Sequence, residues 1–488
     1  MNGFQNTDAT LLDVVIVGAG ISGIAAAYHL QDKCPGKKYR ILEARSSIGG
    51  TWDLFKYPGI RSDSDMQTLG FSFYTWKNPK AIADGPSILE YIKETASHFG
   101  IDKQILFNHG VQEASWSDED KYWTLQIAPN AHVKQETIRC KFLFMCSGYY
   151  DYKAGYAPAF PNSESFEGVI VHPQKWDTNL SYENKNVVVI GSGATAITIV
   201  PEMAKTAKLV TMLQRTPTYI ISLPSKDAIS QFLKKVMPEK WAYSITRWKN
   251  ILVGLAFYNA CRKWPASMKN LILKGVKREL GNAAEMKHFV PSYNPWDQRV
   301  CIVPDSDFFR AIKKKKVEVI TDNIQKFTPA GILLRSGKEI PADIIVSATG
   351  LVIQLLGGMT VKINGKIVDP GTTHCYRGVM LSGIPNFAIT IGYTNASWTL
   401  KCDLSCHYIT RILNYMDENN LSVCTPNFDS KLFASEPFLD FNSGYVKRAD
   451  GKLPKQGSKA PWKVYQNYLR DTISIKYGTI NDKVLEYK

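Results

Sequence analysis

Two glycine-rich segments have the residue types and spacing that bind the pyrophosphate of a dinucleotide. The first contains Gly18, Gly20 and Gly23, and the second contains Gly191, Gly193 and Ala196 at the same spacing. In such a turn the first glycine allows a tight bend, the second lets phosphates approach the backbone, and the third position lets helix and strand pack closely. The helix that follows points its free amide groups at the phosphates. The chain is therefore predicted to bind two dinucleotides.

The residues after each motif favour different nucleotides. Glu43 ends the apolar run Tyr39–Ala44, 20 residues after Gly23, where a carboxylate accepts both ribose hydroxyls of FAD or NAD. After the second motif, Gln214 and Arg215 take that place, and a guanidinium group suits the 2′-phosphate of NADP. We predict FAD at the first site and NADPH at the second, which implies a flavoprotein reduced by hydride. The alternative for Arg215 is an ordinary surface arginine.

The elements that must position these residues can be read from hydrophobic patterning. Each motif follows a β-branched run typical of a buried parallel strand and precedes a helix of small residues. We predict an α/β fold with two nested Rossmann-type dinucleotide-binding domains and a helical insertion. Pro201 should kink or shorten the second helix. The predicted parts are an FAD domain (1–155 and 341–488), an NADP domain (156–219 and 291–340) and the insertion (220–290).

Composition and charge limit the class of protein. The chain has 488 residues, 44% of them hydrophobic, and a net charge of +15, which excludes a disordered chain and suits anionic partners. Nine cysteines without regular spacing favour a reducing compartment. The apolar run Leu11–Leu30 lacks a basic residue before Lys33, so it does not resemble a signal peptide. We expect a cytoplasmic protein.

Much of the positive charge lies in the predicted insertion. Residues 226–279 contain twelve Lys/Arg and three Asp/Glu, so 12 − 3 = +9, interleaved with aromatic residues such as Trp241 and Trp248. One interpretation is a helical cap over the substrate pocket whose basic face is solvated, and we favour it here. The other is peripheral contact of this segment with a membrane surface. No nucleic-acid recognition motif accompanies the charge, so no nucleic-acid partner is expected.

Two longer fingerprints narrow the class. Gly50, Trp52, Tyr57, Pro58, Gly59 and Asp63 fit the pattern GxWxxxxYPGxxxD, and Phe166–Asp177 (FEGVIVHPQKWD) fits FxGxxxHxxxW(P/D). Through them the chain resembles type I Baeyer–Villiger (class B flavin) monooxygenases, and Asn294–Arg299 (NPWDQR) resembles the branch of the ethionamide-activating monooxygenase. Trp176 and Asp177 favour this group over the sister N/S-oxygenating enzymes. For Trp52 and Tyr57, ordinary core packing is the alternative interpretation.

The resemblance implies an activity. NADPH would reduce FAD, and a C4a-peroxyflavin would insert one oxygen atom of O2 into a small apolar ketone to give an ester or lactone, with thioethers or thioamides as further substrates. Two alternatives stay open. One is an N/S-oxygenating flavin monooxygenase without ketone activity, and the other is a non-catalytic NADPH-binding flavoprotein.

The resemblance also assigns site residues. Arg299 would stabilise the negative charge that develops on the reacting oxygen atoms, and Asp63 would orient the Arg299 side chain. The alternative is that the two residues form a simple ion pair without a catalytic role. His172 and Trp176 would lie at the domain junction and couple movement of the NADP domain to flavin chemistry; the alternative for His172 is a structural histidine with satisfied hydrogen bonds. Cys402, Cys406 and His407 match no zinc spacing, so no metal is expected. The FAD contacts would be Gly18, Gly20, Ser22, Gly23, Glu43, Thr51, Trp52, Asp53, Leu54, Asp63 and, unless it is a plain residue of the predicted strand Ile105–Val111, Val111; the NADP contacts would be Ile190, Gly191, Ser192, Gly193, Ala194, Thr195, Ala196, Gln214 and Arg215.

Overall fold

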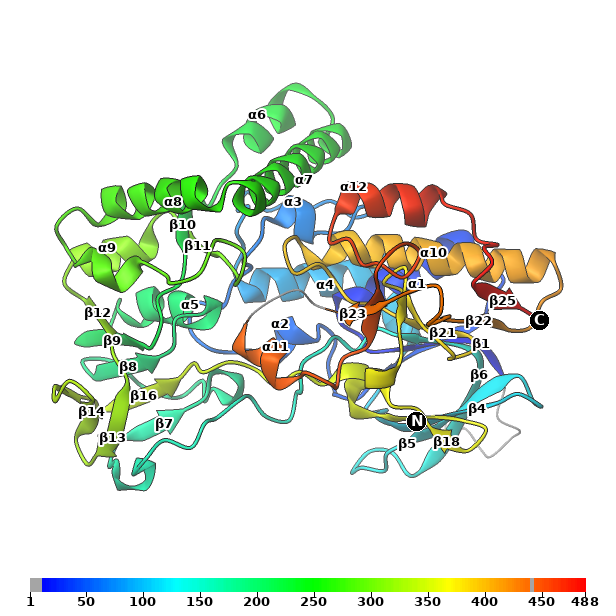
Figure 1. Ribbon diagram of the computed structural model, residues 1–488, viewed down its shortest axis with the longest axis horizontal. Helices are drawn as coiled ribbons and strands as arrows, with labels where there is room; N and C mark the ends of the chain where they lie inside the picture. Colours follow the sequence, from blue (N-terminus) through cyan, green and yellow to red (C-terminus); the bar gives the residue numbers. More distant parts are fainter. Residues whose placement is uncertain (1–10, 439–442) are drawn as a thin grey trace.

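The computed structural model describes residues 11–438 and 443–488. Two α/β units lie side by side, and a group of helices projects from one side of the molecule (Figure 1). One unit is built on a sheet of nine strands and the other on a sheet of five parallel strands. This arrangement confirms the predicted pair of Rossmann-type domains.

The first sheet has a parallel core that carries the first glycine motif. Strand β1 lies at its centre, and Val14, Val15 and Ile16 are buried because other elements cover both faces of the sheet. The parallel core consists of β21 (Phe387–Ile389), β6 (Glu136–Met145), β1 (Leu12–Val17), β2 (Tyr39–Glu43) and β3 (Ile105–Phe107). An extension on the other side of β6 consists of β5 (Tyr122–Ile127), β4 (Val111–Ser117), β17 (Thr360–Ile363) and β18 (Lys366–Ile367).

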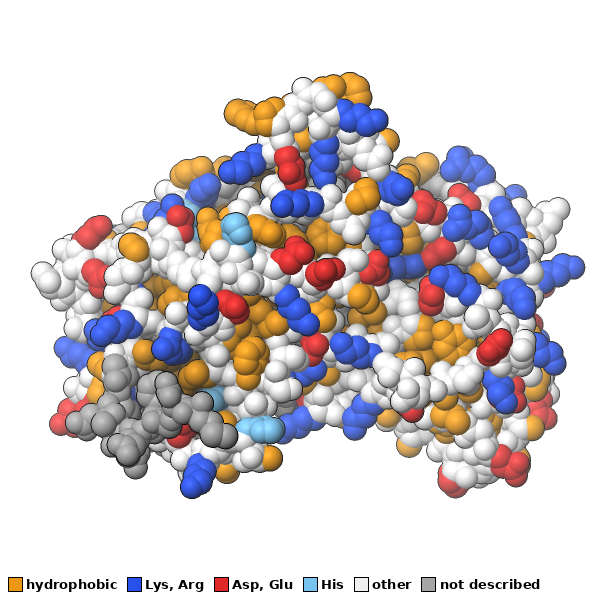
Figure 2. Space-filling view, turned by 180° about the vertical axis from the view of Figure 1, so that it is seen from behind, with side chains coloured by type: hydrophobic (Ala, Val, Ile, Leu, Met, Phe, Trp, Pro, Cys, Tyr) orange, Lys and Arg blue, Asp and Glu red, His pale blue; other side chains and the backbone are white. Residues whose placement is uncertain are grey.

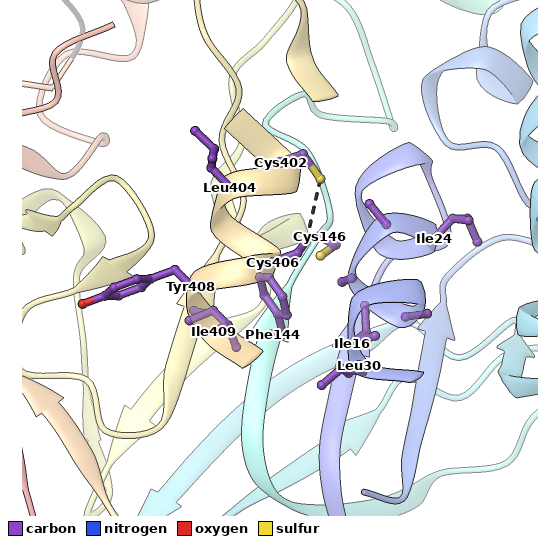
Figure 3. Close-up of a cluster of buried hydrophobic side chains, with 14 of the residues drawn as sticks. Ile16, Ile24, Leu30, Phe144, Cys146, Cys402, Leu404, Cys406, Tyr408 and Ile409 are labelled. Carbon is purple, nitrogen blue, oxygen red and sulfur yellow. Dashed lines mark hydrogen bonds between the residues drawn. The ribbon is translucent and has the colours of Figure 1, made fainter. Parts of the chain in front are cut away.

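Helices α1 (Ile21–Lys33), α4 (Gly85–His98) and α10 (Trp398–Glu418) pack with this sheet in one hydrophobic core. Figure 3 shows Cys402 and Cys406 on α10 facing Cys146 and the side chains of α1. Both cysteines are fully buried and belong to this core. All nine cysteines of the chain are free and buried.

The second sheet carries the second glycine motif. Helix α5 (Ala194–Met203) follows that motif and ends two residues after Pro201, so the proline lies in its last turn and the helix is short, as predicted. Helix α9 (Asp307–Lys313) packs in the same core. The strand order is β12 (Val317–Thr321), β9 (Leu209–Gln214), β8 (Asn186–Ile190), β16 (Ile344–Ser347) and β7 (Val169–Val171).

Two details of the prediction need correction. The second domain was predicted to end at residue 340, but β16 pairs with β8 and β7, so this boundary must move past Ser347. The other domain boundaries stay predictions. Val111 was placed at the end of a strand beginning at Ile105, whereas β3 ends at Phe107 and Val111 opens β4. Asn108 has a φ of 62°, a left-handed conformation that interrupts a strand.

The predicted insertion is helical and connects the two units. It leaves β10 (Ile220–Leu223) and returns at β11 (Cys301–Pro304), which pair in parallel. Its helices are α6 (Ala228–Val236), α7 (Glu239–Lys263) and α8 (Pro265–Leu280). Helix α8 packs on the second core through Val276 and Leu280. Within the described residues, no helix is long and apolar enough to cross a membrane.

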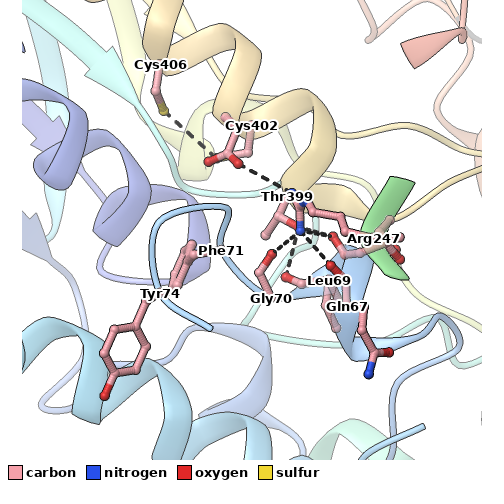
Figure 4. A network of polar contacts seen from close by, with 12 residues as sticks. Gln67, Leu69, Gly70, Phe71, Tyr74, Arg247, Thr399, Cys402 and Cys406 are labelled. Atoms are coloured by element: carbon pink, nitrogen blue, oxygen red, sulfur yellow. Dashed lines mark hydrogen bonds and ion pairs between the residues drawn. The ribbon is translucent and has the colours of Figure 1, made fainter. Parts of the chain in front are cut away.

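A buried arginine ties α7 to the first unit. Arg247 donates hydrogen bonds to the carbonyl oxygens of Gln67 and Gly70, at 2.8 and 2.7 Å, and pairs with Asp403 of α10 at 3.4 Å. Figure 4 shows these contacts converging on one guanidinium group. A charge without hydrogen-bond partners would be costly to bury, so the network fixes α7 against the short helix α3 (Met66–Leu69).

Candidate active site

The first glycine motif forms a tight cradle. Gly18 has a φ of 106°, and a Cβ there would lie 2.7 Å from the carbonyl oxygen of Cys146. A Cβ at Gly23 would lie 1.9 Å from the Gly18 carbonyl oxygen, so helix and strand pack as closely as the motif predicts. Gly20 caps α1 without a side chain, which leaves the first amides of the helix available to a phosphate. The geometry fits the pyrophosphate of FAD.

Glu43, predicted to bind the ribose of that nucleotide, lies at the end of the strand next to the first motif. It ends β2 and is buried, and its Oε2 and Oε1 accept hydrogen bonds from the amides of Ala19 at 2.8 Å and Arg45 at 2.9 Å. Burial raises the pKa of this carboxyl group, against the opposing effect of the two amides. Each oxygen keeps acceptor capacity for a ribose hydroxyl. The His109 amide donates to the Glu43 carbonyl at 2.8 Å, which brings Val111 to the same end of the sheet.

The segment with the remaining predicted FAD residues lies against the same motif. The Gly49 amide donates to the Ala19 carbonyl at 3.0 Å and leads into the one-turn helix α2 (Thr51–Leu54). This helix places Thr51, Trp52, Asp53 and Leu54 beside the first motif. The Thr51 hydroxyl lies 3.3 Å from the Tyr152 hydroxyl, and Asp53 pairs with Arg45 at 2.7 Å. Trp52 packs partly against the first core, so its core-packing interpretation stays open.

Helix α10 closes the first motif. The Trp398 indole Nε1 donates to the hydroxyl oxygen of Ser22 at 2.7 Å, and Ser22 is buried. The Trp398 ring also stacks on Tyr149, with ring centroids 5.2 Å apart. The sequence predicts Ser22 as a cofactor contact but gives no sign of Trp398 as its partner, because no local pattern joins residues so distant in sequence.

The second motif repeats the backbone geometry in a more open setting. Gly191 has a φ of 138°, and a Cβ there would lie 2.4 Å from the Ala348 carbonyl oxygen. Ile190 ends β8, Ala194 and Thr195 begin α5, and Ala196 is buried. Gly193 caps α5 without a side chain, and nothing lies within 4 Å of its Cβ position. The Ser192 hydroxyl donates to the Thr216 carbonyl at 2.8 Å.

Gln214 and Arg215, predicted to contact NADP, point in different directions. Gln214 is buried, and its side-chain nitrogen donates to the His288 carbonyl at 2.7 Å and to the Thr321 hydroxyl at 3.0 Å. Arg215 is exposed just after β9. Of these two side chains, Arg215 is therefore the better candidate for a 2′-phosphate, and this assignment stays a prediction.

The segment Tyr57–Asp63 forms the seam between the two units. The Tyr57 hydroxyl hydrogen-bonds with Thr195 of the second motif, and burial raises the pKa of Tyr57 to about 12. A Cβ at Gly59 would lie 3.0 Å from the Thr198 carbonyl oxygen, so only glycine allows this approach. Arg61 pairs with Asp307 of α9. Tyr57, Gly59 and Arg61, which alternate along this segment, therefore each contact the second unit.

Asp63 ends this seam at the predicted reaction site. Its Oδ2 lies 3.1 Å from Nη1 of Arg299, and both side chains are partly exposed. The structure thus brings the two residues together as the resemblance implied. A guanidinium group held by a carboxylate at the junction of two nucleotide sites can stabilise an anion formed there.

The turn that carries Arg299 is held by the insertion. Trp296 has a φ of 69°, which is rare for a large side chain, and its ring meets Tyr258 of α7 edge to face at 5.6 Å. Asp297 pairs with Arg262 of α7 at 2.9 Å. Sequence reasoning missed all four residues as supports of the site. The signal for Trp296 and Asp297 was their position three and two residues before Arg299.

His172 lies where the two units are connected. Its Nε2 donates to the Gly350 carbonyl at 3.2 Å, and its Nδ1 accepts from the Gln174 amide at 3.2 Å. A Cβ at Gly155 would lie 1.9 Å from the imidazole ring. Burial lowers the pKa of His172, which favours the neutral ring that this hydrogen-bond pattern requires. Trp176 packs against the second core. His172 therefore has structural contacts at the junction, whereas the contact shown for Trp176 is within the second unit.

Comparisons with known proteins agree with this geometry. Residues 12–237 match the family model described as flavin-binding monooxygenase-like (FMO-like). The FAD-containing monooxygenase EthA of Mycobacterium tuberculosis is 55% identical over 478 residues, covering 98% of this chain and 97% of EthA. EthA of Mycolicibacterium smegmatis is 51% identical over 477 residues, covering 97% of this chain and 96% of its own.

Solved structures show the same fold. An oxidized steroid monooxygenase bound to NADP has a TM-score of 0.74 and 22% identity, covering 98% of this chain and 99% of that chain. An open structure of cyclohexanone monooxygenase has a TM-score of 0.74 and 19% identity, with the same coverage of 98% and 99%. The close relatives confirm the family resemblance carried by the fingerprints. The chain therefore belongs to the family of FAD-containing monooxygenases represented by EthA.

Proposed function

We propose that the protein is an NADPH-consuming Baeyer–Villiger monooxygenase that inserts one atom of O2 into small apolar ketones, giving esters or lactones. Thioethers or thioamides are further substrates. The Arg299–Asp63 pair carries this proposal, because it lies on the seam between the two nucleotide motifs. The steroid and cyclohexanone monooxygenases that share the fold support it, because cyclohexanone is a small apolar ketone. The free cysteines support a cytoplasmic enzyme.

The residues of the chain fit this role. Bound FAD, once reduced by NADPH, supplies the activated oxygen. Arg299 would donate hydrogen bonds to the negative charge that develops on the carbonyl oxygen of a ketone under attack. Its charge is permanent, so it stabilises the anion without giving up a proton. Removing a donor of this kind costs about 10²–10³ in rate. Asp63 would keep the guanidinium group aimed at that position.

Ketone chemistry is favoured over pure sulfur or nitrogen oxidation for an electrostatic reason. Attack on a ketone carbon creates an oxyanion on the substrate, whereas attack by sulfur or nitrogen on the activated oxygen creates none there. A fixed cation beside the flavin site is therefore more useful to the first reaction. The helix α7 contacts that hold the Arg299 turn support a precise placement of this cation.

The test is product analysis with the purified yellow enzyme. A panel of aliphatic and aromatic ketones and matched sulfides is incubated with NADPH under ¹⁸O2, and mass spectrometry follows one ¹⁸O atom per product. The proposal expects labelled esters or lactones as well as sulfoxides, with NADH as the control reductant. Sulfoxides without any ester would favour an N/S-oxygenase. A colourless protein that cannot be reconstituted with FAD would favour a non-catalytic binding protein.

A further inference from the structure

The outer end of the insertion exposes large apolar side chains. We call Ile229, Phe232 and Val236 of α6 together with Trp241 of α7 the α6–α7 tip. All four are exposed, Phe232 to 62% and Trp241 to 69%. Figure 1 shows α6 and the adjacent part of α7 as the outermost elements of the molecule, and Figure 2 shows hydrophobic and basic side chains on this projection.

The orientation of α6 is the reverse of that of an ordinary surface helix. Ile229, Phe232 and Val236 recur at helical spacing and form one apolar stripe, which normally faces a core. Here the stripe faces outward, while Ser230 is buried and lies 3.5 Å from the Gln67 side chain of the first unit. A polar contact thus holds the helix, and its apolar face is left for something outside the chain.

Basic side chains surround this apolar face. Lys226, Lys235 and Lys240 are exposed next to it, and the segment 226–279 as a whole carries a net charge of +9 (12 − 3). Two copies of the chain joined through the tip would bring these lysines together, and like charges oppose that contact. Anionic lipid headgroups complement them, and amphipathic helices with lysines beside Phe and Trp bind such surfaces.

The tip rests on a firm base. Below it, the Tyr243 hydroxyl donates to the Phe71 carbonyl at 3.0 Å, and the Asn250 side chain donates to Asp65 at 2.8 Å. The buried Arg247 network fixes the same helix. Lys249 pairs with Asp227, the N-cap residue of α6, at 2.6 Å. The apolar side chains are therefore presented by a supported pair of helices.

From these observations we propose that the α6–α7 tip is a peripheral docking surface for an anionic membrane, with Phe232, Val236 and Trp241 entering the headgroup region. The proposal does not depend on the reaction catalysed. It does connect two parts of the insertion, because α7 begins at the tip and ends at the residues that hold the Arg299 turn. An apolar substrate dissolved in lipid would then meet the enzyme at the surface where it is concentrated.

The test is co-sedimentation of the full-length, FAD-loaded protein with vesicles of phosphatidylcholine alone or with added phosphatidylglycerol. We expect binding to the anionic vesicles that weakens in high salt. The double variant Phe232→Ser/Trp241→Ser should bind at least roughly tenfold more weakly, as should Lys235→Glu/Lys240→Glu. Ile367→Ser is the matched control, because Ile367 is a 72% exposed apolar residue on β18, far from the tip. It should bind like the parent protein.

Three results would overturn the proposal. One is a parent protein that binds neither kind of vesicle at low salt. Another is unchanged binding in both double variants. The third is concentration-dependent self-association, seen by light scattering and lost in Phe232→Ser/Trp241→Ser, without vesicle binding, which would assign the tip to a second copy. FAD content and thermal melting of each variant verify that it is folded. Loss of ketone activity alone would leave the vesicle result unaffected.

Discussion

The two glycine motifs share one backbone geometry but differ in their surroundings. Gly18 and Gly191 both have a positive φ, and a Cβ at either would clash with a carbonyl oxygen. Around the first motif, Gly50 lies 3.6 Å from the Cβ position of Gly20, and Ser22 is covered by Trp398. Around the second, the Cβ position of Gly193 has no neighbour within 4 Å among the described residues.

We expect this difference to separate a resident cofactor from one that must exchange. A nucleotide enclosed by α2 and α10 leaves slowly, because those elements would have to open first. A nucleotide on the open second motif can be released after each hydride transfer. The nucleotide-selecting residues differ in the same way, since Glu43 is buried and held by two amides while Arg215 is exposed. We therefore expect the nucleotide at the more buried first motif to stay bound longer than the one at the second motif.

The largest effects should come from matched changes of the two strained glycines. Gly18→Ala should give colourless protein, because a left-handed conformation and a 2.7 Å contact both oppose a side chain. Gly191→Ala should stay yellow but be reduced by NADPH roughly 10- to 100-fold more slowly. Absorbance of bound flavin and anaerobic stopped-flow reduction measure the two outcomes. Gly36→Ala, where the Cβ position has free space and which lies outside both glycine motifs, is the control. Equal loss of flavin from Gly18→Ala and Gly191→Ala would contradict the difference that we expect between the two motifs.

A smaller effect is expected where the nucleotide is selected. Arg215→Ala should raise the KM for NADPH roughly tenfold, because a charge-assisted contact to the 2′-phosphate is lost. The KM for NADH and the FAD content should not change, since Glu43 belongs to the other site. Steady-state kinetics with both reductants would show this. An equal rise of the KM values for NADPH and NADH would mean that Arg215 does not select the 2′-phosphate.

The smallest effect should follow from loosening the cover of the first motif. Trp398→Phe removes the hydrogen bond to Ser22 but keeps a large aromatic ring. FAD should dissociate roughly 2- to 10-fold faster on dilution, the range given by one hydrogen bond, while the KM for NADPH stays constant. Flavin fluorescence after dilution follows the release. An unchanged rate of FAD dissociation together with a raised KM for NADPH would contradict the idea that α10 encloses the FAD site.

Local patterns were enough to predict the elements that hold the nucleotides. The β-branched runs became β1 and β8, and the small residues after them became α1 and α5, because motif, strand and helix are adjacent in the chain. The Asp63–Arg299 pair could not be predicted from local patterns. The resemblance to a family suggested it, and no periodicity could have joined residues so far apart.

The missed features depend on tertiary contacts. Residues 344–347 read as a buried strand, but which sheet it joins is decided by pairing with β8 and β7. The support of the Arg299 turn by Tyr258 and Arg262 needs α7 to pass beside it. The outward-facing stripe of α6 also contradicts the usual rule, since amphipathic spacing alone predicts an apolar face turned inward.

The most direct test of the account concerns Arg299 at the seam between the two nucleotide sites. Arg299→Ala is reduced by NADPH without oxygen, then mixed with oxygen and a ketone in a single turnover. We predict flavin reduction near the parent rate and ester formation about 10²–10³-fold slower, because only the second step needs the fixed charge. Equal slowing of reduction and oxygen insertion, or ester formation at the parent rate, would contradict the role assigned to this residue.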